Sequence, residues 1–250
     1  MDFIITKGFL HHSARFAEII NNFKNDGTLI GDYQRNIIKH FESLDLKVNV
    51  KSFQQPNNFN RIAYKYFRKS KSRRSFEYAT MLINKGFKTP QPLAYLETSN
   101  LLGLKASYYI SEHLDHLFTL REVLADVTFK DRLAIINGYT AVIYQLHKSG
   151  IEFIDNSSGN ILIEKKDGNY NYFLVDLNRM NFHTEMTISK KLKNFARLSN
   201  DLEVIAIVSK AYARLSNTKE EFCFNTIVES SQLASKRYRL KRKLKFWKLL

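Results

Sequence analysis

The sequence predicts an α+β fold with two lobes, a strand-rich N-terminal lobe with one main helix and a mostly helical C-terminal lobe. Three observations support this prediction. A strictly alternating apolar pattern occurs early in the chain, all three prolines lie within the first 92 residues, and the pattern after residue 190 is helical. We expect residues 1–115 to form the first lobe, residues 116–235 the second, and residues 236–250 a basic tail.

The N-terminal lobe is expected to contain strands around an embedded helical region. Residues 44–51, "LDLKVNVK", put apolar side chains on one face and polar ones on the other, which predicts a half-buried strand. Apolar residues recur at helical spacing over 59–67, and a second helical stretch covers 75–84 and ends before a glycine. Residues 88–97 and 106–114 are predicted as two further strands.

The C-terminal lobe begins with a long helix. Residues 131–149 carry apolar side chains at helical spacing and end before Gly150. Residues 160–177 form two β-rich runs around Asp167-Gly168, a pair that favours a tight hairpin turn. Helices are expected from residue 190 to the end.

The charge of the chain is strongly basic and unevenly spread. The net charge is +15, and between Asp45 and Glu97 the single acid Glu77 stands among eleven Lys and Arg. Such a field attracts polyanions, namely nucleotides, nucleic acid or an anionic membrane surface. For any one lysine, a solvated basic face without a specific partner is the simpler alternative.

The single cysteine, Cys223, excludes an internal disulfide and a cysteine-based metal cluster, and it fits a reducing compartment. The first residues lack an apolar run long enough for a signal peptide. No segment approaches the roughly 20 apolar residues of a membrane span. We therefore expect a cytoplasmic protein that is at most peripheral to a membrane.

Two polar residues of the first lobe have the types needed for phosphoryl transfer, which requires a cation for the nucleotide phosphates. Lys51 ends the alternating strand, whereas Lys65, in "IAYKYF", has apolar neighbours at helical spacing and should lie on a helix. We therefore assign the phosphate contact to Lys51. Glu77 is its expected ion-pair partner, and the alternative for Glu77 is a surface salt bridge with Arg73 or Arg74.

Three polar residues of the second lobe complete the pattern. Asp155 lies five positions before Asn160 in the loop "DNSSGN", and Asp176 ends the apolar run "FLVDLN". In a phosphotransferase these would be the catalytic carboxylate and two Mg²⁺ ligands. Each motif alone is weak, because loop Asp and Asn are usually turn formers. Their order along the chain makes the pattern more specific.

The sequence resembles the lipopolysaccharide kinase (Kdo/WaaP) family of Gram-negative bacteria, whose members phosphorylate inner-core sugars and have a protein-kinase-like fold. The resemblance covers residues 46–182, with weaker similarity through "LKNFARLSND". It is carried by "VKSFQQPNNFNRIAY", "RKSKSRRSFEYATML", "GFKTPQPLAY", "SYYISEHL", "LHKSGIEFIDNSSGNILI" and "VDLNRMNF".

The resemblance implies ATP and Mg²⁺ as cofactors and an acceptor sugar, Kdo or heptose, in the lipopolysaccharide core or its Kdo-lipid A precursor. It assigns the phosphate contact to Lys51, its partner to Glu77, the catalytic base to Asp155 and the metal ligands to Asn160 and Asp176. A hinge around Glu112 would present backbone groups to adenine. Arg35, near Gly31 in "IGDYQRN", is a further candidate phosphate contact.

The chain departs from the family pattern at four places. Phe153 replaces a loop histidine, Ile154 replaces a basic residue, and Ser158 stands where the family has proline. No glycine-rich phosphate loop is visible. The histidine is ordinarily a structural support, so a phenylalanine can preserve packing and lose one hydrogen bond. These departures keep open a pseudokinase, and a kinase of proteins or small molecules is another alternative.

The C-terminal tail, "KRYRLKRKLKFWKLL", contains eight cations and no acid. As a helix it places Leu240, Leu244 and Trp247 on one face, a pattern typical of a helix lying on an anionic membrane. A solvated terminus and nucleic-acid binding are the alternatives. Nucleic-acid binding explains the charge but not the ordered polar residues, so we expect the inner-membrane surface as partner and no specific nucleic acid.

Overall fold

The computed structural model describes residues 2–31, 36–43, 46–115 and 117–246. The chain forms two compact units. Unit 1 comprises residues 1–115 together with Asp176–Asn178, and unit 2 comprises residues 116–175 and 179–250. The short Asp176–Asn178 segment therefore belongs to the first unit, although it is far from it in sequence.

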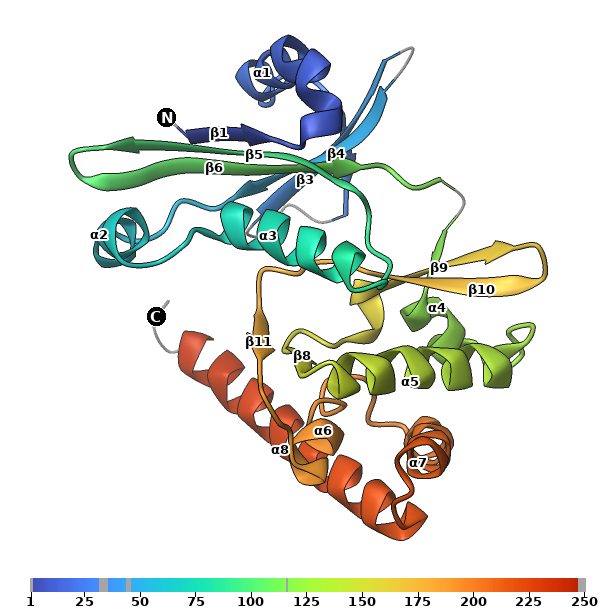
Figure 1. Ribbon diagram of the computed structural model, residues 1–250. Coiled ribbons are helices and arrows are strands. Elements are labelled where there is room, and N and C mark those ends of the chain that lie inside the picture. Colours follow the sequence, from blue (N-terminus) through green and yellow to red (C-terminus); the bar gives the residue numbers. More distant parts are fainter. Residues whose placement is uncertain (1, 32–35, 44–45, 116, 247–250) are drawn as a thin grey trace. The chain divides into compact units, whose positions relative to one another are not determined.

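Unit 1 is built on an antiparallel sheet, which has six strands in the described part of the chain, in the order β1-β5-β6-β4-β3-β2 (Figure 1). The β5–β6 hairpin and the β3–β4 pair are its longest ladders. The strands are β1 (Asp2–Ile5), β2 (Thr28–Ile30), β3 (Asn36–Ser43), β4 (Leu46–Phe53), β5 (Pro92–Asn100) and β6 (Gly103–Glu112).

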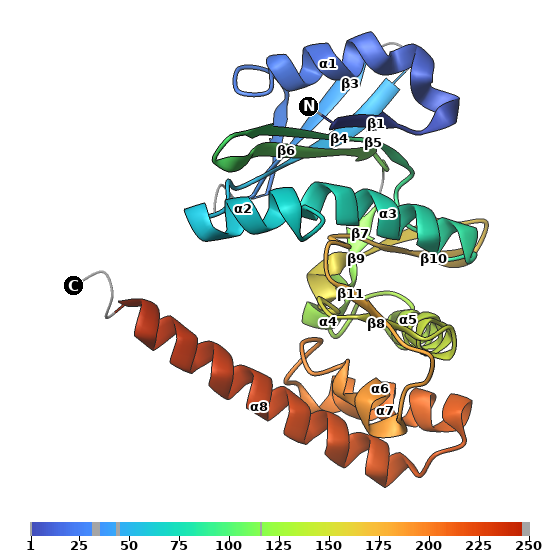
Figure 2. The same ribbon diagram turned by 60° about the vertical axis from the view of Figure 1, so that its left-hand side comes forward.

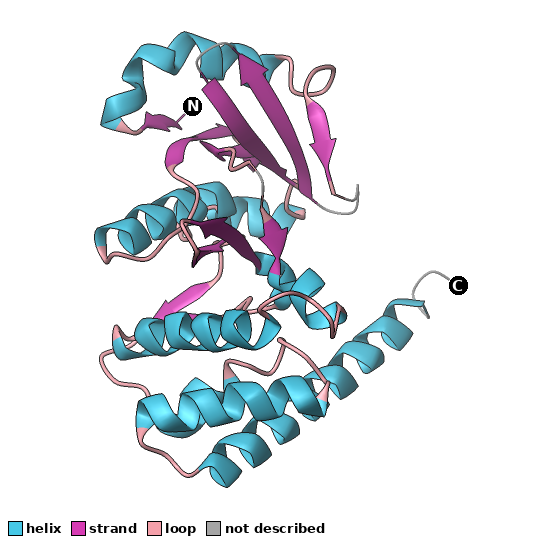
Figure 3. Cartoon of the chain, turned by 90° about the vertical axis from the view of Figure 1, so that its right-hand side faces the viewer, coloured by secondary structure: helices cyan, strands magenta, loops and turns pink. Residues whose placement is uncertain are grey.

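Helices cover both faces of this sheet (Figures 1 and 3). On one face, Phe16 and Ile19 pack with Val48, Val50 and Ile110 in a buried cluster. The other face carries α2 and α3. The helical elements of unit 1 are η1 (Lys7–His12), α1 (Ser13–Asn21), α2 (Asn58–Tyr66) and α3 (Lys71–Asn84).

The structure confirms the alternating strand, the two helical stretches and the two later strands of unit 1. The predicted strand starts at Leu46 in the described residues, since Leu44 and Asp45 lie outside them. Helix α3 begins at Lys71, four residues earlier than predicted, because the Ser70 hydroxyl accepts a hydrogen bond from the Arg73 amide and caps it. Helix α1 was not expected.

Unit 2 is mostly helical, as predicted (Figure 2). Helix α5 packs against α7, and α7 against α8. Its elements are β7 (Phe118–Thr119), α4 (Leu120–Ala125), α5 (Arg132–Lys148), β8 (Ile151–Phe153), η2 (Ser158–Asn160), β9 (Ile161–Lys166), β10 (Asn169–Leu174), β11 (Met180–Phe182), α6 (Ile188–Lys193), α7 (Leu202–Ser216) and α8 (Glu220–Phe246).

Two turns set the course of the chain through unit 2. The β9–β10 hairpin closes at Asp167 and Gly168, both with positive φ (50° and 77°), which is the tight turn that their sequence predicts. Gly150, with a φ of 72°, follows the end of α5. A Cβ added to it would lie 2.1 Å from the backbone oxygen of His183, the residue after β11. Only glycine fits this close approach.

Helix α8 continues without a break through residue 236 to Phe246. Residues 236–242 are exposed, with Tyr238 and Leu240 among them. The predicted position of Trp247 on the apolar face of the tail falls on a residue outside the described ones. None of the described helices is both long and apolar enough to cross a membrane.

Candidate active site

Lys51 and Asp176 form an ion pair within unit 1. Strand β4 places Lys51 between Ile38 on β3 and Tyr109 on β6. Because side chains alternate along a strand, the buried Val48 and Val50 face α1 and Lys51 emerges on the opposite face. Its Nζ lies 2.6 Å from Oδ1 of Asp176, which is 125 residues later in the chain. The structure thus brings together two of the predicted site residues.

The Asp176 backbone is held in an unusual conformation. Its φ is 59°, in the left-handed region that non-glycine residues rarely adopt. Leu177 and Asn178, which follow Asp176, are buried, and the Asn178 side-chain amide donates to Oδ1 of Asp176 at 2.5 Å. A conformation of this kind costs about 1–3 kcal/mol and persists where surrounding contacts hold it, often at functional sites. The carboxylate is therefore fixed beside Lys51.

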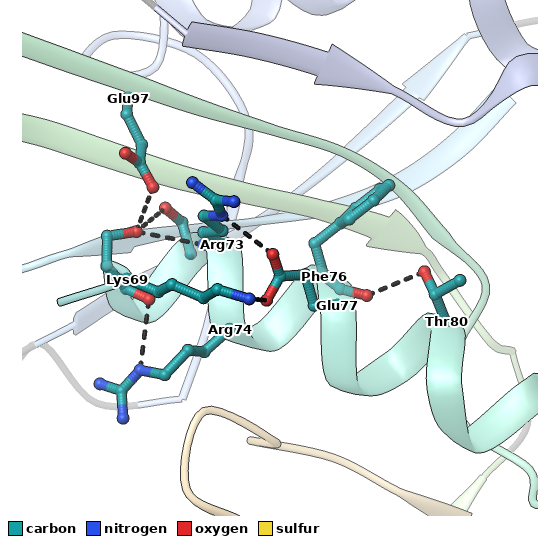
Figure 4. Close-up of polar contacts among 9 residues, drawn as sticks. Lys69, Arg73, Arg74, Phe76, Glu77, Thr80 and Glu97 are labelled. Carbon is teal, nitrogen blue, oxygen red and sulfur yellow. Dashed lines mark hydrogen bonds and ion pairs between the residues drawn. The ribbon is translucent and has the colours of Figure 1, made fainter.

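The expected ion pair between Lys51 and Glu77 is not formed among the described residues. Glu77 lies on α3, where its carboxylate accepts hydrogen bonds from Lys69 at 2.7 Å and Arg73 at 2.9 Å (Figure 4). Arg73 is one helical turn before Glu77, so local spacing supplies this partner. The surface salt bridge that was the alternative for Glu77 is what the structure contains.

The environment of Glu77 explains its charge. Burial raises the pKa of this carboxyl, but the hydrogen bonds from Lys69 and Arg73 outweigh burial and the pKa is lowered. Nearby, Glu97 accepts a hydrogen bond from the Ser70 hydroxyl at 2.5 Å (Figure 4), and burial raises its pKa. Both carboxylates thus accept hydrogen bonds from residues in or just before the first turn of α3.

Asp155 lies in the loop after β8 in unit 2, with its side chain 12% exposed. Its Oδ1 accepts hydrogen bonds from Nη1 of Arg179, at 3.1 Å, and from Nη1 of Arg197. Both arginine side chains are about half exposed. Within the described residues, no hydrogen bond reaches Oδ2 of Asp155. One oxygen is thus fixed by two cations, and the other is free to accept a hydroxyl.

Asn160 closes the same loop. Its amide nitrogen Nδ2 donates to the backbone oxygen of Asp155 at 2.8 Å, and its backbone oxygen accepts from Val175 at 3.0 Å. The short 3-10 turn η2 contains Ser158, where the family has proline. In the described part of the chain, Oδ1 of Asn160 accepts no hydrogen bond and remains a potential ligand oxygen.

Phe153, which stands where the family that the sequence resembles has a histidine, is fully buried. The loop that follows it is held by amide side chains instead. Asn194 donates through Nδ2 to the Phe153 backbone oxygen at 2.8 Å. The buried Asn156 accepts from the Tyr139 hydroxyl at 2.8 Å and donates to the Asn194 backbone oxygen at 3.2 Å. The loop is therefore anchored on α5 and α6 without a histidine at position 153.

His147 extends this buried network. Its ring nitrogens lie 3.1 Å from Oδ1 of Asn194 and 2.9 Å from the Tyr212 hydroxyl. Burial lowers the pKa of His147 to about 4, so the imidazole is neutral at neutral pH. A neutral ring can donate to the Asn194 oxygen and accept from the tyrosine, which satisfies every member of the chain.

Two predicted site residues are not part of these clusters. Glu112 is the last residue of β6, and its amide donates to the oxygen of Gln91, the residue before β5, at 2.9 Å, so this amide already has a hydrogen-bond partner. Arg35 lies outside the described residues.

The predicted metal ligands, Asp176 and Asn160, are oxygen donors of the type that suits Mg²⁺. No group of three or more His, Cys, Asp and Glu side chains suited to a metal occurs in the described residues. Mg²⁺ keeps several waters and takes one or two carboxylates together with substrate phosphates. Taken singly, the Asp176 carboxylate of unit 1 and the Asn160 amide oxygen of unit 2 are each hard oxygen donors.

Sequence reasoning did not assign roles to Arg179, Arg197 or Asn194, nor to Asn178 beside Asp176. All four lie in the blocks "VDLNRMNF" and "LKNFARLSND" that carry the family resemblance. Membership of those blocks was the available signal. Their contacts join segments distant in sequence, which spacing alone does not reveal.

No protein-family model matches the chain, and no curated protein matches it by sequence. Among solved structures, WaaP in complex with acyl carrier protein matches with a TM-score of 0.65 and 14% identity, covering 95% of this chain and 100% of that chain. The Rio2 kinase-ADP/Mg²⁺-phosphoaspartate complex from Chaetomium thermophilum matches with a TM-score of 0.48 and 16% identity, covering 93% of this chain and 78% of that chain. The chain thus has the fold of WaaP, which confirms the α+β, protein-kinase-like fold predicted from the sequence.

Proposed function

We propose that this protein is an ATP-dependent phosphotransferase that phosphorylates an inner-core sugar, Kdo or heptose, of lipopolysaccharide. The observation that carries the proposal is the Lys51–Asp176 pair at 2.6 Å within unit 1. It joins, across 125 residues, the two charges that a kinase uses for nucleotide phosphates and for Mg²⁺. The fold shared with WaaP supports this reading, as do the blocks that resemble the family.

In this proposal, the Lys51 ammonium would contact the phosphates of a bound nucleotide, and the Asp176 carboxylate would be a ligand of Mg²⁺. Asn160 supplies a second ligand oxygen through Oδ1. Mg²⁺, when bound, neutralises charge on the phosphates.

Asp155 receives the acceptor hydroxyl at Oδ2, while Arg179 and Arg197 hold Oδ1. The hydroxyl oxygen attacks the γ-phosphorus, the bond from that phosphorus to the bridging oxygen breaks, and ADP leaves. The hydroxyl proton passes to the Asp155 carboxylate and then to solvent. Orientation of the hydroxyl and charge neutralisation supply most of the rate in such a reaction.

An acceptor that is part of a lipid lies at a membrane surface, and the basic end of α8 suits such a location. Residues 236–242 are exposed and helical. Cations next to an anionic leaflet contribute about 1 kcal/mol each. We therefore propose that the tail binds the anionic inner-membrane surface and confines the enzyme to the plane of its acceptor. The acyl carrier protein bound to WaaP is a further candidate partner.

The proposal is tested with a panel of acceptors offered with Mg·ATP: Kdo-lipid A precursor, a heptose-extended core, casein and choline. Phosphorylation of either lipopolysaccharide acceptor, located by mass spectrometry, is the expected result. Transfer to casein or choline alone would contradict the sugar assignment. Asp155→Asn should lose transfer to these acceptors, and Asp126→Asn is its control, because Asp126 is an exposed acid that accepts hydrogen bonds from Thr128 in another loop.

A pseudokinase is the second candidate, and Phe153 is the observation that favours it. A protein of that class would bind ATP and transfer phosphate to none of the acceptors. The network of Asn194, Asn156 and Tyr139 favours an ordered loop, and hence the enzyme.

A further inference from the structure

Exposed apolar side chains occur both at the end of α2 and at the turn between β5 and β6 that packs against α2. At the turn, Leu101 is 94% exposed and Leu102 66% exposed. Just beyond α2, Phe67 is 82% exposed, and Ile62 and Tyr66 lie one helical turn apart on the helix with about half of their surface exposed or more. We call these five residues the α2–turn patch. Large apolar side chains grouped in this way mark an interaction surface more often than chance exposure.

The helix and the turn are joined as one surface. Arg61 donates through Nε to the Leu104 oxygen at 3.2 Å and through Nη2 to Oδ1 of Asn100 at 3.3 Å. Gly103 packs so closely that an added Cβ would lie 2.5 Å from the Arg61 carbonyl. Figures 1 and 2 both show α2 beside this end of the β5–β6 hairpin. The patch is therefore presented by a fixed scaffold.

Its surroundings are basic. Arg68 and Lys105 are exposed next to the patch in sequence. From Leu46 to Leu96 the sequence contains one acid, Glu77, and that carboxylate is already paired with Lys69 and Arg73. Cations around protruding apolar side chains match a surface with anionic groups outside and hydrocarbon beneath.

We propose that the α2–turn patch inserts into the headgroup layer of an anionic lipid bilayer. Leu101, Leu102 and Phe67 enter the boundary between headgroups and acyl chains, and Arg68 and Lys105 bind lipid phosphates. A turn with an almost fully exposed leucine at its tip suits insertion between headgroups better than a flat protein interface does. This contact belongs to unit 1 and is separate from the α8 tail, and it does not depend on transferase activity.

Insertion is measured with an environment-sensitive dye on Leu101→Cys. The native Cys223 is buried, so the label goes to the new thiol. Val127→Cys, at a 70% exposed position in unit 2, is the matched control. With full-length protein and vesicles of phosphatidylglycerol and phosphatidylethanolamine, we expect a blue shift at position 101 and none at 127. Vesicles of phosphatidylcholine alone should give no shift.

Binding is measured by co-sedimentation of a variant in which Phe67, Leu101 and Leu102 are all serine. We expect its affinity for the anionic vesicles to fall at least about tenfold, since each exposed side chain would bury much of its surface. Serine at Val127, Leu133 and Leu202, which are likewise exposed, should leave affinity unchanged. Unaltered binding by the patch variant, or a dye at 101 that stays in water while the protein binds, would overturn the proposal.

Discussion

The ammonium group of Lys51 contacts a carboxylate and lies over an aromatic ring. It is 2.6 Å from Asp176 Oδ1 and 5.4 Å from the centroid of the Phe53 ring, and the side chain is 13% exposed. Neighbours of this kind favour one position for a side chain that is otherwise mobile. The charge is therefore available at a defined point on the α3 side of the sheet.

Replacing Lys51 with methionine should weaken Mg·ATP binding by about 10- to 100-fold, since a hydrogen bond to a charged group contributes about 1.5–3 kcal/mol. Isothermal titration calorimetry measures the change. Lys47→Met is the control, because Lys47 is on the same strand and pairs with Glu42 and Asp115 instead. Equal affinity of the two variants would remove Lys51 from the nucleotide site.

The buried imidazole of His147 makes stability depend on pH. Its pKa falls from an ordinary 6.5 to about 4 on folding, because burial disfavours the charged form. Between these values the unfolded chain binds a proton that the folded protein does not. The free energy of unfolding should therefore fall as pH drops from 6.5 to about 4, by up to about 3 kcal/mol.

Urea unfolding of unit 2 at a series of pH values measures this dependence. His147→Gln keeps a polar side chain in the network without a group that titrates there, so its profile should be flatter over the same window. Identical slopes for the two proteins would mean that other groups cause the acid sensitivity.

The ion pairs of Glu77 and Lys51 differ in how far they could be predicted, because only the first joins residues close in sequence. Glu77 and Arg73 are four residues apart on one helix, so the sequence already contained that pair as the alternative. The partner of Lys51 depends on the Asp176–Asn178 segment joining unit 1, which no local spacing reveals.

At the scale of secondary-structure elements, the junction between α5 and β8 sets where the Asp155 loop begins. Gly150 ends the helix with a positive φ, and its backbone oxygen accepts from the His183 amide at 2.8 Å. The short strands β8 and β11 follow in register from this point, with Phe153 opposite Met180. A change of backbone conformation at Gly150 should therefore displace the Asp155 loop.

Gly150→Ala should destabilise unit 2 by about 3–5 kcal/mol, because the new Cβ would meet a backbone oxygen at 2.1 Å in addition to the strained φ. Gly168→Ala isolates the effect of φ, since Gly168 has a φ of 77° and open space around it. This control should lose only about 1 kcal/mol. Denaturant unfolding measures the loss of unfolding free energy in both variants. Equal losses would contradict a close contact between Gly150 and the His183 backbone.

Helices and strands with a clear hydrophobic period could be predicted from the sequence. Very short strands, and helices whose burial depends on residues far along the chain, could not. Strand β4 and helix α5 each display their pattern over eight or more residues. Strands β8 and β11 have three residues each, too few to show alternation. Helix α1 has nine residues, and its burial depends on β4 and β6 far along the chain.

At the scale of the whole molecule, the basic charge is concentrated in regions suited to anionic partners. The end of α8 exposes Lys236, Arg237, Arg239, Lys241 and Arg242. Changing these five residues to glutamine should lower affinity for anionic vesicles at least about tenfold, at about 1 kcal/mol for each cation near the surface. Co-sedimentation at low and high salt measures it. Equal binding of variant and wild type at low salt would exclude the tail from membrane contact.

The protein-kinase-like fold was predictable from the sequence, since the blocks of family resemblance span residues 46–182 and the WaaP structure matches 95% of the chain. The contacts of the candidate site residues could not be predicted from the sequence. The structure pairs Lys51 with Asp176 rather than with the expected Glu77, and the roles of these residues stay predictions. The arginines on Asp155 and the amide network behind Phe153 required three-dimensional structure.

The most direct test of the account is phosphate transfer from radiolabelled ATP to Kdo-lipid A precursor in single-turnover experiments with wild type and Asp155→Asn. The amide keeps the size of the side chain and removes the negative charge that accepts the proton. We predict transfer by the wild type, a loss of about 10²- to 10⁴-fold in the variant, and unchanged Mg·ATP affinity in both. Transfer at the wild-type rate by Asp155→Asn, or no transfer by a wild type that binds Mg·ATP, would contradict it.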